Sequence, residues 1–232
     1  MATIVLVHGA WHGGWCWRRV APLLAREGHR VLTPTLTGLG ERAHLARPEV
    51  DLETHIADLE GVFRFEEVAE AVVVAHSYAG FPATALADRM GERVRRLVYL
   101  DAFVPGAGDS FMSLLAPATR DAFRRRAAAN DPSWLVPPLR PRHYGVSDPA
   151  DQAWLAGLLV GHPLASFEQP LRLLRPDREH PARSYVYCSA PAMGDFDRFA
   201  ERAREEPGWR YHALATGHDA MVTEPEALAD II

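Results

Sequence analysis

The sequence predicts an α/β fold, in which a mostly parallel central sheet carries helices on both faces and an inserted helical cap interrupts the core. Short apolar runs such as residues 3–7 and 71–75 are typical of parallel strands buried on both faces. These runs alternate with helix-like stretches, as in parallel-sheet proteins. Across residues 105–181 the alternation stops and prolines become frequent. A segment of that length with helical stretches of its own predicts a cap instead of a linker.

Strands and helices are expected to alternate before the cap. The strands are aliphatic and β-branched runs at residues 3–7, 31–36, 71–75 and 96–100. The first helix, at about 18–27, ends before Gly28, a residue favoured just after a helix. The second, within 51–64, has its apolar residues at spacings of three and four, which place them on one helix face. The third covers residues 82–90.

Helices within the cap are expected at residues 112–129 and 149–160. The alternation then resumes with a strand at 185–188, a helix at 195–205, a strand at 209–214 and a helix at 224–232. A chain of 232 residues has the size of one domain. We therefore expect a core formed by residues 1–104 and 182–232, with the cap of residues 105–181 inserted in it.

Composition excludes several functions. All 25 basic residues are arginine, because the sequence contains no lysine. A lysine Schiff base and a P-loop lysine are therefore excluded. The net charge of −5 argues against nucleic-acid binding, and no apolar run has the length of a membrane span. Cys16 and Cys188 form neither a disulfide framework nor a metal motif, so we expect a cytoplasmic protein without metal or cofactor. A homodimer is left open.

Ser77 is the candidate nucleophile. It lies in the sequence Ala75-His76-Ser77-Tyr78-Ala79-Gly80, between the third strand and the helix that follows. A sharp strand–turn–helix connection exposes such a serine, and small flanking residues let strand and helix approach each other. Alanines occupy both positions at which the G-x-S-x-G pattern has glycine. The alternative role of this serine is an ordinary helix N-cap.

A loop rich in glycine, histidine and tryptophan, residues 8–15, follows the first strand. In folds with such a serine turn, this loop supplies one backbone N–H of an oxyanion hole. We expect the N–H groups of Ala10 and Tyr78 to be the two donors. A metal site at His8 and His12 is disfavoured because the pattern supplies no third ligand. A dinucleotide site is disfavoured because the G-x-G-x-x-G spacing is missing.

His218 is the candidate general base. It lies in Thr216-Gly217-His218-Asp219, after the last expected strand. A triad of this fold class follows the chain order serine, acid, histidine, and Ser77 and His218 fit that order.

The motifs resemble those of the α/β-hydrolase superfamily, and within it the plant methylesterase and hydroxynitrile lyase branch with its bacterial esterase relatives. The resemblance rests on residues 5–15, the turn around Ser77, residues 99–105 and residues 217–221, and it covers nearly the whole chain. It implies a Ser-His-acid triad and a small pocket beneath a helical cap.

The resemblance also separates two reactions. Hydroxynitrile lyases of this branch use a lysine just after the catalytic histidine and a threonine in the first loop. Here Asp219 and Gly9 occupy those positions. Ester hydrolysis is therefore favoured over cyanohydrin cleavage.

The triad acid has three candidates. Plant members of the family place it after the strand that precedes the last helices, but residues 188–193 contain no carboxylate here. Asp195 and Asp197 come slightly later, where the next helix begins, and fit equally well as charges at a helix N-terminus. Asp101 ends the fourth strand, beside the nucleophile strand, and is the favoured acid. Its alternative role is a hydrogen bond that caps the following loop.

The sequence thus predicts a serine hydrolase that cleaves a small, largely apolar carboxylic ester through an acyl-enzyme. The aromatic residues expected to line its pocket, with cap-to-core packing as their alternative role, are Trp11, Phe81, Phe103, Trp134 and Trp154. The alternative activities are a thioesterase or acyl transferase and a lyase acting on a ketide-like substrate. A ligand-binding protein with weak turnover is the alternative from another class, motivated by the two alanines and the displaced acid.

Overall fold

A six-stranded parallel sheet forms the centre of the computed structural model, which describes residues 1–175 and 181–232. Its strand order is β2-β1-β3-β4-β7-β8, and every neighbouring pair is parallel. The strands are β1 (Thr3–Val7), β2 (Arg30–Leu32), β3 (Ala71–His76), β4 (Val94–Leu100), β7 (Ala182–Cys188) and β8 (Trp209–Leu214). The predicted α/β fold is confirmed.

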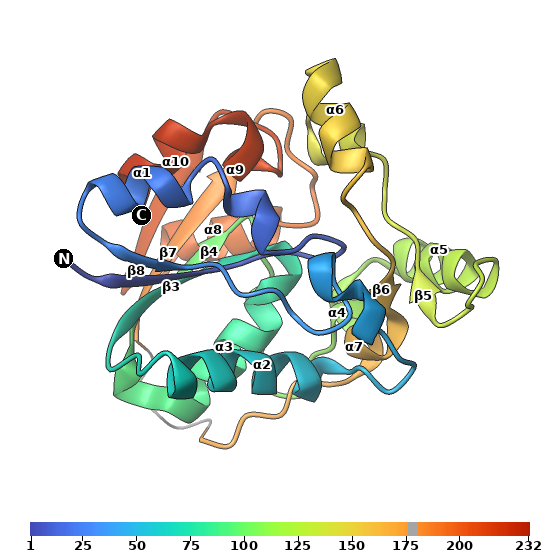
Figure 1. Ribbon diagram of the computed structural model, residues 1–232, viewed down its shortest axis with the longest axis horizontal. Coiled ribbons are helices and arrows are strands. Elements are labelled where there is room, and N and C mark those ends of the chain that lie inside the picture. The colour runs from blue at the N-terminus through green and yellow to red at the C-terminus, as the bar shows by residue number, and fades with distance from the viewer. Residues whose placement is uncertain (176–180) are drawn as a thin grey trace.

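Helices cover both faces of this sheet. α1 (Ala21–Arg26) and α10 (Pro225–Ile231) lie on one side, and α2 (Leu52–Phe65) and α3 (Gly80–Met90) lie on the other (Figure 1). α8 (Asp197–Glu205) packs against β7 and β8, and the short α9 (Ala220–Thr223) precedes α10. Strand side chains such as Val5, Val73 and Val98 are buried between the two helix layers. This explains why the strands read as continuous apolar runs.

The segment between β4 and β7 lies at the ends of the strands where the chain leaves the sheet (Figure 1). Its helices are α4 (Phe111–Leu114), α5 (Pro117–Ala128), α6 (Pro149–Ala156) and α7 (Leu164–Glu168). Its two short strands, β5 (Leu135–Val136) and β6 (His162–Pro163), pair antiparallel. The predicted cap, residues 105–181, includes residues 176–180, which lie outside the described residues.

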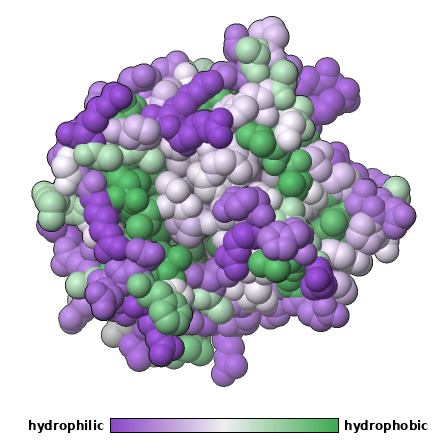
Figure 2. Space-filling view, in the orientation of Figure 1, coloured by the Kyte–Doolittle hydropathy of each residue, from purple (hydrophilic) through white to green (hydrophobic). Residues whose placement is uncertain are grey.

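Short 3-10 helices complete the described structure. They are η1 (Gly14–Trp17), η2 (Gly40–Leu45), η3 (Ser77–Ala79), η4 (Gly91–Arg93) and η5 (Pro141–Tyr144). No described helix has the length and apolar character needed to cross a bilayer. Figure 2 shows hydrophilic side chains around the rim of the visible face, residues of intermediate hydropathy at its centre, and apolar residues on the left and at the foot of α6, where the inserted segment meets the core.

Two predicted elements differ from the structure for local reasons. The strand expected at 31–36 ends at Leu32, because the run contains Pro34, which has no N–H to donate to a neighbouring strand. The helix expected at 112–129 is divided into α4 and α5, and Pro117 begins the second of them. A proline fits the first turn of a helix but disrupts its interior, so the division falls where the sequence requires it.

Candidate active site

Ser77 begins the turn between β3 and α3 and has a φ of 55°, in the left-handed region that side chains other than glycine rarely adopt. Strained backbone of this kind concentrates at functional sites. Two glycines, Gly9 and Gly80, allow the backbone to pack closely around this turn, and neither of them is at position 75 or 79, where the G-x-S-x-G pattern has glycine. A Cβ on Gly9 would lie 2.9 Å from the Ser77 Cβ, and one on Gly80 would overlap the Phe103 carbonyl oxygen.

His218 and Asp101 form a buried acid–base pair. The His218 Nδ1 lies 2.7 Å from the Asp101 Oδ2, and the two side chains are 4% and 1% exposed. The Asp101 Oδ1 accepts a hydrogen bond of 3.2 Å from the N–H of Cys188. Because Asp101 holds Nδ1–H, the His218 Nε2 is the nitrogen that can take a proton from a nucleophile.

The other two candidate acids have different surroundings. Asp197 accepts a hydrogen bond of 2.6 Å from the Tyr187 hydroxyl, at the surface. Asp195 is half-buried in the wall of the cavity described below. Burial raises the pKa of its carboxyl, and this outweighs the opposing attraction of His218. His218 therefore has Asp101 as its hydrogen-bonded carboxylate.

The loop after β1 is held by hydrogen bonds to the inserted segment. Trp11 has a φ of 65°, and its backbone N–H donates to the His162 Nδ1 at 3.3 Å. Its indole N–H donates to the Val136 carbonyl at 2.9 Å, and its carbonyl accepts the N–H of Val160 at 3.1 Å. Ala10 is thereby held at the cavity wall beside Ser77. The Tyr78 hydroxyl is itself buried and lies 2.9 Å from the His55 Nδ1.

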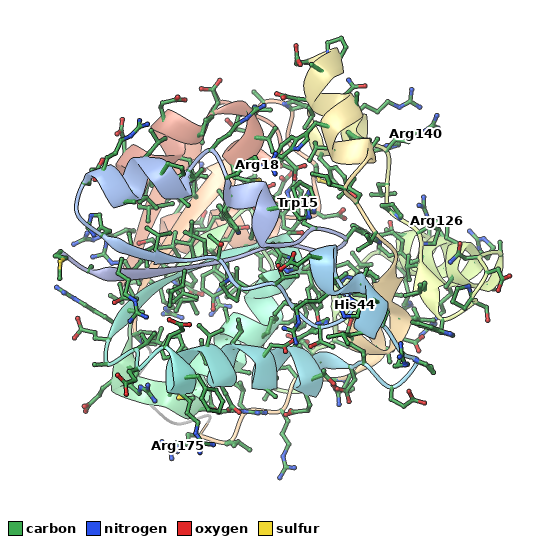
Figure 3. All side chains as sticks on the ribbon, in the orientation of Figure 1. Trp15, Arg18, His44, Arg126, Arg140 and Arg175 are labelled. Atoms are coloured by element: carbon green, nitrogen blue, oxygen red, sulfur yellow. The ribbon has the colours of Figure 1, made fainter. Side chains whose placement is uncertain are left out.

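Ser77 and His218 line one cavity of about 390 Å³ beneath the inserted segment. Most of its wall is aromatic or aliphatic, and Phe111 and Phe123 of the inserted segment form part of it. Its charged side chains are Asp195 and Arg126 of α5, which Figure 3 labels. The Arg126 guanidinium donates to two proline carbonyls at 2.8 Å each. A cavity of this size and composition suits a small, largely apolar ligand.

Of the predicted pocket residues, Trp11 and Phe103 line this cavity. The other three, Phe81, Trp134 and Trp154, lie outside its lining. Phe81 is fully buried behind Phe103, with ring centroids 5.9 Å apart. Trp134 precedes β5, where its carbonyl accepts the N–H of Leu164. Trp154 of α6 packs edge to face on Trp15, which lies near the foot of that helix in Figure 3.

Phe111, Phe123 and Phe196 belong to the cavity wall and were not predicted. The Phe196 ring stacks on His218, with centroids 4.9 Å apart and an interplanar angle of 9°. Phe111 lies in the four-residue α4, which is too short to show a period, and the spacing of apolar residues in α5 does not say whether Phe123 faces a cavity or the packed core.

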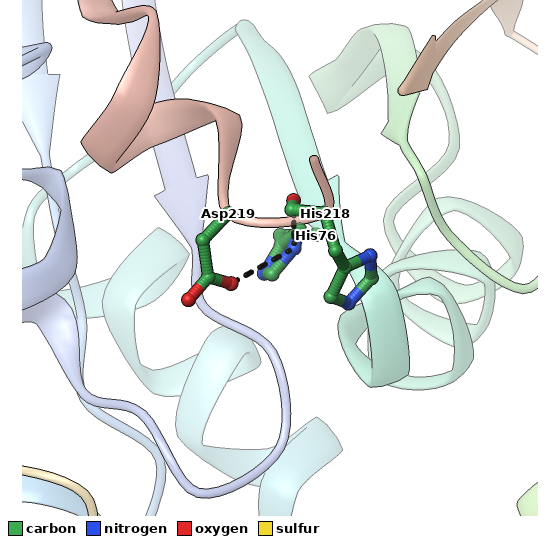
Figure 4. Close-up of side chains that lie close together, drawn as sticks. All are labelled: His76, His218 and Asp219. Carbon is green, nitrogen blue, oxygen red and sulfur yellow. Dashed lines mark hydrogen bonds and ion pairs between the residues drawn. The ribbon is translucent and has the colours of Figure 1, made fainter. Parts of the chain in front are cut away.

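His76, His218 and Asp219 gather behind the nucleophile, with His76 between the other two in Figure 4. The ligating atoms of these residues lie within 4.8 Å of one another. The His76 Nε2 donates to the His218 carbonyl at 3.1 Å. Burial is the main reason that the pKa of His76 lies well below its ordinary value, and repulsion from His218 and His12 lowers it further. One nitrogen of His76, one nitrogen of His218 and one oxygen of Asp219 have hydrogen-bond partners, whereas the His76 Nδ1 and the Asp219 Oδ1 have none among the described residues.

Comparison with known proteins agrees with this geometry. The sequence matches the Alpha/beta hydrolase family over residues 4–231. The carbendazim hydrolyzing esterase of Nocardioides sp. (strain SG-4G) is 42% identical over 238 residues, 99% of this chain and 98% of that protein. Methylesterase 9 of Arabidopsis thaliana is 38% identical over 110 residues, 45% of this chain and 41% of that protein.

Among solved structures, an extracellular α/β-hydrolase from a Paenibacillus species has a TM-score of 0.88 to this chain at 20% sequence identity. The similarity covers 100% of this chain and 97% of that one, and it shows a shared fold. The family match and the full-length similarity to the Nocardioides protein lead to one conclusion: this chain belongs to the alpha/beta hydrolase family.

Proposed function

We propose that this protein is a serine esterase that hydrolyses a small, largely apolar carboxylic ester through an acyl-enzyme on Ser77. One observation carries the proposal. The strained Ser77 and His218, whose ring is bound by Asp101, lie on separate loops and both line one apolar cavity. The full-length similarity to an esterase supports the same activity.

The proposed residues account for each step of ester hydrolysis. As the Ser77 Oγ attacks the ester carbonyl carbon, its proton passes to the His218 Nε2, and Asp101 stabilises the resulting imidazolium through Nδ1–H. The carbonyl oxygen becomes an oxyanion, which accepts hydrogen bonds from the backbone N–H groups of Ala10 and Tyr78. His218 then protonates the leaving alcohol, and the acyl group stays on Ser77. Water, deprotonated by His218, releases the acid.

The cavity favours esters over the alternative substrates. The cavity wall consists mainly of aromatic and aliphatic groups and carries few charges, as a small apolar ester requires. The position that holds lysine in the lyase branch is Asp219, which is fully buried and contacts His12 instead of lining the cavity. Cyanohydrin cleavage through a lysine is therefore not supported here.

A fluorophosphonate probe tests the nucleophile. We expect the probe to label the folded protein at Ser77, identified by peptide mass spectrometry, and the Ser77→Ala variant to stay unlabelled. Absence of labelling in the folded wild-type protein would instead favour the ligand-binding alternative.

Substrate class is tested with p-nitrophenyl esters of increasing acyl length, methyl esters, carbendazim and acyl-CoA thioesters. The name of the 42%-identical relative makes carbendazim one of the first compounds to try. We expect the highest kcat/KM for small apolar esters. A clear preference for acyl-CoA would move the assignment to a thioesterase or acyl transferase.

A further inference from the structure

A buried contact joins two loops that the proposed reaction needs in register. His12 lies two residues after Ala10, in the loop that supplies the proposed oxyanion donor, and Asp219 comes directly after His218. The His12 Nε2 lies 3.3 Å from the Asp219 Oδ2, and the two side chains are 1% and 0% exposed. The contact links positions 207 residues apart in the chain.

The hydrogen-bond partners of His12 define its protonation. Its Nε2 faces the Asp219 carboxylate, and its Nδ1 lies 2.7 Å from the Ala10 carbonyl oxygen. A carboxylate and a carbonyl oxygen only accept hydrogen bonds, so both ring nitrogens must donate. His12 is therefore an imidazolium cation, and Asp219 is its counter-ion.

Other buried histidines near the site have a different arrangement. The His8 Nε2 accepts the N–H of Leu36, and the His162 Nδ1 accepts the N–H of Trp11. Each of these rings therefore has one unprotonated nitrogen and is neutral. His12 differs from them because neither of its ring nitrogens faces a donor.

The charges around His12 agree with this assignment. Burial acts to lower the pKa of His12, but attraction and hydrogen bonding to Asp219 outweigh burial, and the net pKa is raised. Burial holds four neighbouring titratable groups in their neutral forms. Burial lowers the pKa values of His8 and His76, and it raises those of the Cys16 thiol and the Tyr144 hydroxyl, whose ring packs against His12.

His12 and Asp219 are each connected to one residue of the proposed reaction, Ala10 and His218 respectively. His12 binds the carbonyl of Ala10, and this fixes the orientation of the Ala10–Trp11 peptide. Asp219 is covalently next to His218, and its own N–H donates to the Tyr144 carbonyl at 3.2 Å. His76 binds the His218 carbonyl from behind. The His12–Asp219 contact thus adds a direct connection between the loop of Ala10 and the loop of His218, beside the Trp11 hydrogen bonds that also hold Ala10.

We propose that the buried His12–Asp219 ion pair is a positioning element: it holds the loop of residues 8–15 and the loop that carries His218 at the separation that catalysis requires. The inference rests on the proposed function, because it assigns roles to Ala10 and His218. His12 and Asp219 are positioning residues, since both act through neighbours instead of touching the substrate.

Two single variants, His12→Gln and Asp219→Asn, remove the ion pair from opposite sides. We expect kcat for the best ester to fall about 10- to 100-fold in each, with KM nearly unchanged, because misplacement of about 1 Å has effects of that size. In the double variant, the Gln amide can donate to the Asn carbonyl, so neither side leaves an unpaired charge. We expect the double variant to recover part of kcat, so that the two losses do not multiply.

Tyr99→Phe is the matched control. It removes a buried hydrogen bond of 2.8 Å to Thr84, elsewhere in the core, and we expect a loss of stability without a change in kcat. All variants are assayed below their melting temperatures. If either folded single variant keeps kcat within about twofold of wild type, or the two losses simply multiply, the positioning role is overturned.

Imidazole ¹⁵N NMR tests the ion pair without relying on activity. At neutral pH we expect the His12 ring, assigned by its absence in His12→Gln, to show two protonated nitrogens. In Asp219→Asn we expect that signature to be lost. A neutral His12 in the wild-type protein would overturn the inference. Failure of the wild-type protein to hydrolyse esters or react with the probe would instead overturn the proposed function, which keeps the two failures distinguishable.

Discussion

Asp101 divides its carboxylate between two parts of the site. One oxygen binds the His218 ring, and the other accepts the N–H of Cys188 at the end of β7. Its own N–H donates to the Val186 carbonyl at 2.7 Å, and its φ is 40°. These contacts fix both the position of the carboxylate and the tautomer of His218. The carboxylate therefore orients the base without needing to accept its proton.

The Asp101→Asn variant should fold normally and lose most of its turnover. An amide oxygen can still accept a hydrogen bond, but the amide N–H₂ favours the wrong His218 tautomer, and such losses reduce kcat by about 10³- to 10⁴-fold in serine hydrolases. Steady-state kinetics on the best ester, with circular dichroism to verify folding, gives the measurement.

Asp197→Asn provides the matched control, because Asp197 bonds the Tyr187 hydroxyl away from the cavity and should leave kcat unchanged. Near-normal turnover in Asp101→Asn would show that another group orients His218. Asp195 would then be the next variant to test, since it lies in the same cavity wall.

At the scale of elements, α3 begins so close to the loop after β4 that a side chain on its first residue, Gly80, would overlap the Phe103 carbonyl oxygen. The Phe103 N–H also donates to the Ser77 carbonyl at 3.3 Å, so the same contact connects the serine turn to the loop beyond Asp101. The alanines at 75 and 79 are fully buried and fit without glycine. A small residue is required instead at Gly9, which lies against Ser77, and at Gly80, which lies against Phe103.

Gly80→Ala should destabilise the fold and also reduce kcat. The added methyl group would overlap the Phe103 carbonyl, and overpacking of this kind typically costs about 1–3 kcal/mol. The overlap would displace the segment around Phe103, whose N–H donates to the Ser77 carbonyl, so kcat should fall as well. Urea denaturation and ester kinetics on the same preparation measure both effects.

Gly61→Ala in α2 is its control, because nothing lies within 4 Å of a Cβ added there. Alanine favours a helix interior over glycine, so this variant should gain roughly 0.5–1 kcal/mol and keep its activity. A Gly80→Ala protein as stable and active as wild type would show that α3 can move away from β4 at little cost.

The elements that the sequence predicted best are those whose pattern depends on their own residues. Strands β1 and β8 have the predicted bounds, because each is a short run bounded by turn residues. The pairing of β5 with β6 and the short helices α7 and α9 were not predicted. These elements contain two to five residues, too few to show a period, and contacts distant in the sequence hold them in place.

At the scale of the whole molecule, the parallel sheet explains why distant residues meet. The segments after β1, β3, β4 and β8 leave the sheet at the same edge, and they carry Ala10, Ser77, Asp101 and His218. The chain order and the strand ends were sufficient to predict that these residues gather. The cavity wall was less predictable, because Trp134 and Trp154 lie in an inserted segment whose packing no short pattern determines.

The same architecture buries several neutral histidines. His8, His55, His76 and His162 are all fully buried, and burial lowers the pKa of each below its ordinary value of 6.5, to about 3 for His8. In the unfolded chain these rings take up protons near pH 6.5. Below that pH the unfolded state therefore binds more protons than the folded state, and the free energy of unfolding must fall as the pH falls.

Acid should therefore destabilise this protein steeply, beginning near pH 6.5. Each buried neutral histidine contributes a slope of up to about 1.4 kcal/mol per pH unit in the window from 6.5 down to its folded pKa. His12 acts in the opposite direction, because its pKa is raised: its contribution is complete below pH 6.5 and is lost as the pH rises through its folded pKa.

Urea denaturation at about pH 7, 6 and 5 gives the slope. His8→Asn, in which the amide keeps a donor for the Gly9 carbonyl, should reduce that slope by about one proton, while replacement of the exposed His143 by Asn should not. An equal slope in wild type and His8→Asn would mean that His8 is already protonated in the folded protein, contrary to its hydrogen bonds.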